Sequence, residues 1–240
     1  MLLPTGLNAI FIVLTLQPML QIPIIYEDKY LLVVNKPHGI IVEHDLGGHR
    51  NVLDTLAMQF KGTYKGNNII RNVHRIDRRV SGALLIARKQ SALKLLNEQF
   101  ATRQVKKTYF ALVSQLPPAS EATLSHWLIK DNVEKRAFIS DRKFKESTEA
   151  QLSYKMKAQV EGKILLEIDL ITGKYHQIRA QLAHIGCPVI GDVKYGSKDI
   201  YMPDAIALHA ESLTFPHPIE QTPMSIHAPT PSDPLWDLFR

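Results

Sequence analysis

The chain of 240 residues contains a single cysteine, Cys187, so it cannot form an intramolecular disulfide bond. A zinc site built from several cysteine thiolates is excluded for the same reason. So little cysteine is typical of proteins from a reducing compartment, and we therefore expect a cytoplasmic location.

Long hydrophobic runs are also missing. The apolar segment at residues 9–14 is much shorter than the ~20 residues that a membrane-spanning helix needs. No lysine or arginine precedes it, whereas a secretory signal peptide starts with a positively charged segment. We expect no membrane partner. Residues 1–20 are interpreted as an N-terminal extension, either disordered or part of a wrongly assigned start, and residues 21–240 as one domain.

Basic residues outnumber acidic ones, with 29 Lys and Arg against 23 Asp and Glu, a formal charge of +6 and a pI near 9.3. This balance favours an anionic partner such as nucleic acid, although many basic proteins bind no polyanion. The hydrophobic fraction of 45% and the charged fraction of 22% are ordinary for a globular protein with a buried core.

Alternating apolar and polar residues, with turn residues between them, predict more strands than helices. Several neighbouring strands are separated by short turns, which favours hairpins and an α+β fold around a mixed, largely antiparallel sheet. Residues 131–147 are polar and charged, and we expect a hairpin or a mobile loop there. The predicted strands cover residues 21–26, 30–35, 68–73, 83–87, 107–114, 122–129, 150–160, 163–172 and 207–215, and the predicted helices residues 51–60, 91–100 and 176–185.

The densest polar cluster, residues 71–82, holds four arginines, one histidine and a single carboxylate, Asp77. It lies between two predicted strands, and loops held by rigid elements commonly carry function. The neighbouring arginines would keep Asp77 ionised, as a nucleophile or a base requires. These residues alone slightly favour a simpler interpretation, in which Asp77 only offsets the charge of a solvated loop.

Two further segments carry polar side chains at regular spacing. His176 and Arg179 are three residues apart at the start of a predicted helix, so they share a face that could present Arg179 to a buried carboxylate. Lys107 and Tyr109 alternate along a predicted strand and share one of its faces. A tyrosine beside basic residues can stack on a base or accept a proton. Taken singly, an ordinary helix start and a half-buried strand tyrosine are the commoner interpretations.

Taken together and in order, these segments resemble the RluA-type pseudouridine synthase family over most of residues 24–218. Each motif is weak alone, but five in order at plausible spacing form a strong signal. The matching motifs are residues 30–39 with Asn35-Lys36-Pro37; His74-Arg75-Ile76-Asp77 with Ser81-Gly82; Lys107-Thr108-Tyr109; residues 173–179 with Gly191-Asp192 and Tyr195-Gly196; and Leu208-His209-Ala210 with His217-Pro218.

The resemblance implies the pseudouridine synthase fold, with helices and loops forming an RNA-binding cleft, and conversion of a uridine to pseudouridine in structured rRNA or tRNA. It implies no cofactor and no metal. Asp77 would be the catalytic carboxylate, Arg179 would pair with it, and Tyr109 would stack on the target base. Arg75 would help to displace the target nucleotide. The other residues expected to bind RNA are His74, Arg78, Arg79, Lys107, Lys174, His176 and Gln177.

The chain departs from the family pattern at three positions. Val80 stands where threonine is usual, and Lys174 and Tyr175 stand where arginine and threonine are frequent. Lys174 keeps the charge but lacks the two-pronged donor geometry of arginine. The chain starts almost at the catalytic domain, and we expect no room for the N-terminal RNA-binding module of some relatives.

Two alternative functions were weighed against pseudouridine synthesis. One is a non-catalytic RNA-binding protein on the same fold, although the intact set of Asp77, Tyr109 and Arg179 argues against it. The other, less favoured, is a metal-dependent hydrolase that uses some of the ten histidines and nearby acids. No obligate protein partner is evident from the sequence.

Overall fold

The computed structural model describes residues 21–61 and 69–240. The predicted extension at residues 1–20 and the first residue of the predicted strand 68–73 lie outside the described residues.

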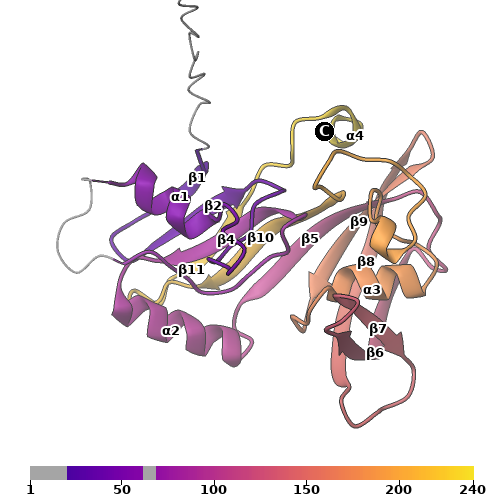
Figure 1. Cartoon of the computed structure of the whole chain (residues 1–240), viewed down its shortest axis with the longest axis horizontal. Helices are drawn as coiled ribbons and strands as arrows, with labels where there is room; N and C mark the ends of the chain where they lie inside the picture. Colours follow the sequence, from indigo (N-terminus) through magenta and orange to yellow (C-terminus); the bar gives the residue numbers. More distant parts are fainter. Residues whose placement is uncertain (1–20, 62–68) are drawn as a thin grey trace, which may run out of the picture.

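The described residues build one long, mixed sheet with helices packed along it (Figure 1). Its main path runs β1-β2-β4-β10-β5-β9-β8-β6-β7, while β3 pairs with β4 and β11 with β10. The strands are β1 (Ile24–Glu27), β2 (Leu31–Lys36), β3 (Arg71–Asn72), β4 (Ser81–Ala87), β5 (Lys106–Val113), β6 (Glu121–Asp131), β7 (Arg136–Ser140), β8 (Thr148–Val160), β9 (Lys163–Leu170), β10 (Leu208–Pro216) and β11 (Pro223–His227).

Among the described strands, only β4 and β10 pair in parallel, and the other pairs are antiparallel. The predicted hairpin of β8 and β9 is present, with Glu161 and Gly162 in its turn. The predicted α+β class with a largely antiparallel mixed sheet is confirmed.

Two helices cover opposite faces of the sheet around β2 and β4. Helix α1 (Val52–Gln59) packs on alternate residues such as Leu84 and Ile86, and α2 (Gln90–Ala101) packs on the intervening ones, such as Leu85. All seven residues of β4 are therefore buried, as expected for a strand that is covered on both faces.

The other half of the sheet is covered mainly on one face. Helix α3 (Gln177–His184) lies over β6, β7 and β8, on the side where Tyr109 and Ile168 face the core (Figure 1). The opposite face carries polar residues such as Thr108 and Asp169, which are paired across β5 and β9. This one-sided cover produces the alternation that predicted these strands.

The structure corrects several details of the predicted elements. The hairpin expected within residues 131–147 is confirmed, since they contain β7, which pairs with β6, and the corrections concern other elements. Strand β3 is only two residues long, and α2 begins at Gln90 after Lys89 rather than after Ser91. Three elements were not predicted, namely β11, the 3-10 turn η1 (Val193–Tyr195) and α4 (Pro234–Asp237). These are short elements, and their residues show little periodicity.

Gly82 fixes how closely β4 approaches β10, just after the loop that carries Asp77. Its φ is +114°, and it lies opposite Ala210 in the parallel pair. A Cβ atom at this position would overlap the backbone of Ala210. Only glycine allows both this conformation and this contact.

Replacement of Gly82 by alanine should therefore destabilise the protein by roughly 3 kcal/mol, because overpacking adds to backbone strain. Urea unfolding would measure the change. Gly162→Ala is the matched control, since Gly162 also has a positive φ but open space around it. Equal losses of stability in the two variants would show that the contact with Ala210 is unimportant.

Candidate active site

A cleft of about 1010 Å³ opens on the sheet, next to the start of α3. All residues expected to act in catalysis or RNA binding line it. The wall is strongly basic, and its acidic members include Asp77. The predicted site residues that line it are His74, Arg75, Asp77, Arg78, Arg79, Lys107, Tyr109, Lys174, His176, Gln177 and Arg179.

Hydrogen bonds from Lys36 in β2 join the loop that presents Asp77 to the segment that follows β2. The Lys36 ammonium is buried and donates to the carbonyl oxygens of Pro37, Ile40 and Arg78, at 2.9, 2.9 and 3.2 Å. An ammonium has three donors, so Lys36 is fully satisfied. Burial lowers the pKa of Lys36 to about 7, although the nearby Asp77 carboxylate opposes the shift. Lys36 thus holds the backbone of the residue after Asp77.

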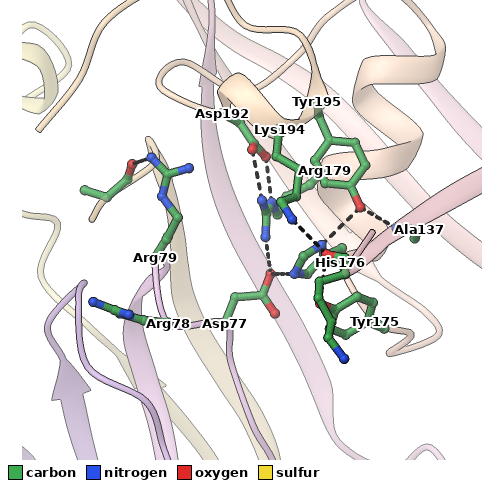
Figure 2. A network of polar contacts seen from close by, with 12 residues as sticks. Asp77, Arg78, Arg79, Ala137, Tyr175, His176, Arg179, Asp192, Lys194 and Tyr195 are labelled. Atoms are coloured by element: carbon green, nitrogen blue, oxygen red, sulfur yellow. Dashed lines mark hydrogen bonds and ion pairs between the residues drawn. The ribbon is translucent and has the colours of Figure 1, made fainter. Parts of the chain in front are cut away.

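Arg179 joins two carboxylates at the centre of the site (Figure 2). Its Nε and Nη2 donate to Asp192 at 2.6 and 2.9 Å, and its Nη1 donates to Oδ2 of Asp77 at 3.0 Å. The side chains of Arg179 and Asp192 are 4% and 0% exposed, against 28% for Asp77. Burial acts to lower the pKa of Arg179, but the two carboxylates outweigh it and raise that pKa. The predicted pair of Arg179 and Asp77 is therefore present.

His176, the N-cap of α3, also approaches Asp77. Its Nε2 lies 3.6 Å from Oδ2 of Asp77, and its Nδ1 lies 3.0 Å from the hydroxyl of Tyr195. The ring of Tyr175 stacks on it at 3.9 Å between centroids. His176 has left-handed backbone angles, φ 52° and ψ 24°, which cost roughly 1–2 kcal/mol for a residue other than glycine. Strain of this kind is common at functional sites.

Tyr109 forms part of the cleft floor. Its position in β5, opposite Ile168 of β9, leaves the side chain 7% exposed. Burial raises the pKa of its hydroxyl, and the Asp77 charge adds to this effect. The group is therefore a neutral phenol at physiological pH.

The arginines and Lys174 differ in how freely they can meet a ligand. Arg75 is exposed, with only a 3.6 Å ion pair to Glu43, and Lys174 is also exposed. By contrast, Arg78 binds Asp204 and a backbone carbonyl, and Arg79 donates to two backbone carbonyls. Arg75 and Lys174 are thus better placed for mobile contacts to a polyanion than Arg78 and Arg79.

Two residues predicted to bind RNA make hydrogen bonds and ring contacts within the protein instead. The Gln177 amide is 2% exposed; its oxygen accepts two hydrogen bonds and its nitrogen donates two. We therefore assign Gln177 a structural role in place of the predicted RNA contact. The Nε2 of His74 accepts the backbone N–H of Leu85, and its ring stacks on Phe100. Although His74 lines the cleft, its geometry fits support of the Asp77 loop.

Several residues at the site were not assigned a role from the sequence. Lys36, Asp192 and Tyr195 lie in the motifs that carried the family resemblance, so motif membership was a signal for them. The cleft also contains lysines from the β6–β7 hairpin and from η1, for which no sequence signal exists. These lysines are Lys130, Lys135 and Lys194.

Within residues 21–61 and 69–240, one group offers three metal-ligand atoms within 4.8 Å of one another, namely His126, Asp141 and His184. None of these residues lines the cleft. The amide nitrogen of Gln181 faces Nδ1 of His126 at 3.0 Å and also donates to two carbonyl oxygens, which fixes its orientation. We assign no metal to this group.

No helix in the described part of the chain is both long and apolar enough to span a membrane.

Comparison with known protein families identifies the class of protein to which this basic cleft belongs. The family model described as RNA pseudouridylate synthase matches residues 30–184. The chain therefore belongs to the RNA pseudouridylate synthase family, which confirms the resemblance found in the sequence.

Curated relatives include enzymes named for both rRNA and tRNA. Ribosomal large subunit pseudouridine synthase C of Buchnera aphidicola is 35% identical over 215 residues, which cover 86% of this chain and 66% of the relative. The chain thus spans slightly less than two thirds of that relative. The tRNA pseudouridine synthase C of Vibrio cholerae is 31% identical over 237 residues, which cover 90% of this chain and 93% of the relative.

Solved structures share the fold. Human RNA Pseudouridylate Synthase Domain Containing 1 superposes with a TM-score of 0.73 at 25% identity, covering 90% of this chain and 86% of that one. Human RNA Pseudouridylate Synthase Domain Containing 4 gives a TM-score of 0.72 at 23% identity, covering 88% and 89%. The predicted pseudouridine synthase fold is confirmed.

Acid should destabilise the protein through two histidines at the site. Burial lowers the pKa of His74 to about 3 and that of His176 to about 4, against 6.5 as the ordinary value. Between the ordinary pKa of 6.5 and these lowered pKa values, the unfolded chain binds more protons than the folded one. The free energy of unfolding therefore falls as the pH drops from about 6.5 towards 3. Urea unfolding at a series of pH values measures this slope. It should be shallower in His74→Gln, and identical slopes would contradict the role of His74.

Proposed function

We propose that this chain isomerises a uridine to pseudouridine in a structured RNA, with Asp77 as the catalytic carboxylate. The observation that carries the proposal is the bond between Asp77 and Arg179 within a basic cleft of about 1010 Å³. Such a cleft has room for a nucleotide and attracts its phosphates. Family membership and the names of the relatives point to the same reaction.

Asp77 has one oxygen bound and one oxygen open. Both Arg179 and His176 approach Oδ2, whereas Oδ1 makes no hydrogen bond to another described residue. The carboxylate is oriented through Oδ2, and Oδ1 remains available to a substrate in the cleft. This arrangement suits a nucleophile or base better than an exposed carboxylate with free rotation would.

The reaction requires that the bond between N1 of uracil and C1′ of ribose breaks and that a bond from C5 to C1′ forms. The proton on C5 is lost, and N1 gains one, so the product is an isomer of the substrate. Tyr109, as a neutral phenol in the cleft wall, can stack on the free base and retain it while it turns. If the Tyr109 hydroxyl also takes part in the proton transfer, it must do so as the neutral phenol.

The target uridine must leave its base stack to reach Asp77, which costs roughly a few kcal/mol. Arg75 is exposed on the cleft rim and could fill the vacated space with its planar group. The relatives' names include both rRNA and tRNA enzymes, and we propose a structured RNA of one of these classes as substrate, in the cytoplasm.

Basic residues on both sides of Asp77 give the RNA backbone a path across the cleft. Arg75 pairs with Glu43 in the segment before α1, the Lys107 ammonium lies beside Gly173 next to Lys174, and Lys135 lies in the β6–β7 turn. Contacts from such side chains to phosphates are insensitive to sequence and weaken with salt. They would position the RNA, while Asp77 performs the chemistry.

Asp77→Asn should abolish pseudouridine formation, a loss of at least about 1,000-fold, because the amide is neither nucleophile nor base. The fold should survive, since Arg179 keeps its two bonds to the buried Asp192. Mass spectrometric detection of pseudouridine in rRNA and tRNA transcripts gives the activity, and filter binding gives RNA affinity.

The matched control is Asp169→Asn, which makes the same chemical change on the opposite, polar face of the sheet. It should keep the wild-type rate. Normal turnover by Asp77→Asn would contradict the proposal. RNA binding by wild type without any turnover, on both classes of RNA, would favour a non-catalytic RNA-binding protein.

Lys135→Asn and Lys174→Gln should each weaken RNA binding and reduce the slope of log K against log salt by about 1. Asparagine is chosen at position 135 because Lys135 has a positive φ of 50°. The exposed Lys155 on the opposite face provides the control Lys155→Gln. An unchanged slope in both cleft variants would place the RNA backbone elsewhere.

A further inference from the structure

Tyr195 holds His176 in place beside the carboxylate of Asp77 (Figure 2). The Tyr195 oxygen accepts the backbone N–H of Ala137 at 2.7 Å, and it lies 3.0 Å from Nδ1 of His176. A phenol has one proton to donate. Among the described residues, Nδ1 of His176 is the acceptor within hydrogen-bond distance of this hydroxyl, so we assign the Tyr195 proton to the bond with Nδ1.

This hydrogen bond fixes the tautomer of His176. With Nδ1 as the acceptor, the imidazole proton lies on Nε2, which is the atom that faces Oδ2 of Asp77 at 3.6 Å. That distance is too long for a hydrogen bond, but it places an N–H dipole against the carboxylate. The other tautomer would present a lone pair to the same oxygen and repel it.

Tyr195 itself is held from several sides. It is buried, at 7% exposure, and its ring lies 5.0 Å from the Arg179 guanidinium, in a cation–π contact. Its hydroxyl is fixed by Ala137, which belongs to β7. Burial also raises the pKa of Tyr195 to about 12, so the proton stays on the hydroxyl. The residue therefore contacts both groups that approach Oδ2 of Asp77.

We propose that Tyr195 and His176 act as a pair of positioning residues for Asp77, in which the Tyr195 hydroxyl sets the tautomer of His176 and the His176 Nε2–H orients the carboxylate together with Arg179. This inference rests on the proposed function, and it assigns His176 a task other than the RNA contact predicted from the sequence. Hydrogen bonds that fix a histidine tautomer in this way are common around metal and catalytic sites.

Two single variants and their combination test the pair. Tyr195→Phe keeps the ring against Arg179 and removes the hydroxyl, and His176→Gly removes the imidazole at a position whose left-handed backbone glycine adopts without strain. Each should lower the single-turnover rate of pseudouridine formation at saturating RNA by about 10-fold to 100-fold, as expected for a lost interaction with a charged group. The Kd for RNA should change by less than about threefold.

The double variant should be no slower than the slower single variant, because both changes remove the same interaction. Additive losses would overturn the proposal. Tyr154→Phe is the matched control, since the buried Tyr154 also donates its hydroxyl to a backbone carbonyl, that of the exposed Ala119, away from the cleft. It should lower the melting temperature and leave the single-turnover rate unchanged.

Substitution of His176 by glutamine or asparagine separates a positioning role of its ring nitrogens from a packing role of the side chain. In His176→Gln the amide can reach the place of Nε2, whereas in His176→Asn it reaches only that of Nδ1. We expect Gln to restore part of the rate lost in His176→Gly and Asn to restore none, although Asn tolerates the left-handed conformation better. Equal rates for the two amides, or wild-type rates in Tyr195→Phe, would refute the pair. A wild-type chain without activity would instead refute the proposed function.

Discussion

The buried ion pair of Arg179 and Asp192 is the interaction on which the site depends. Burying both charged groups costs desolvation free energy, and the two hydrogen bonds between them offset that cost. The contact uses Nε and Nη2 of Arg179 and leaves Nη1 directed into the cleft, where it binds Asp77. A partly exposed carboxylate thereby acquires a rigid partner, and its direction is set by groups that solvent does not reach.

The sheet topology brings these groups together from distant parts of the chain. Asp77 precedes β4, whereas Arg179 lies in the first turn of α3, 102 positions later. Strand β4 reaches the second half of the sheet through its parallel pair with β10, and the close approach at Gly82 sets their separation. On the other side, the N–H of Ala137 in β7 holds Tyr195. The site is therefore stable only when both halves of the sheet are formed.

Sequence reasoning succeeded where a local pattern determines structure. Alternation predicted β8 and β9, and the helix predicted at residues 51–60 is present as α1, with Asn51 as its N-cap. It failed where tertiary contacts decide the outcome. In the sequence Lys36 looks like any solvated lysine, but in the fold three carbonyl oxygens from two loops surround it. Gln177 was predicted to bind RNA, but hydrogen bonds within the protein satisfy its amide completely. Asp77 and Arg179 were found through ordered motifs, because no local rule links residues so far apart.

The cleft combines two kinds of electrostatics with different sensitivity to solvent. The carboxylate network around Arg179 is buried and little screened, so its geometry should not vary with salt or with the RNA that is bound. The lysines of the rim are exposed and lie on loops or element ends, where substitutions cost little stability. Relatives of similar identity to this chain are named for rRNA or for tRNA. A buried pair of Arg179 and Asp192 behind a replaceable basic rim would give a physical reason why relatives on one fold are named for both kinds of RNA.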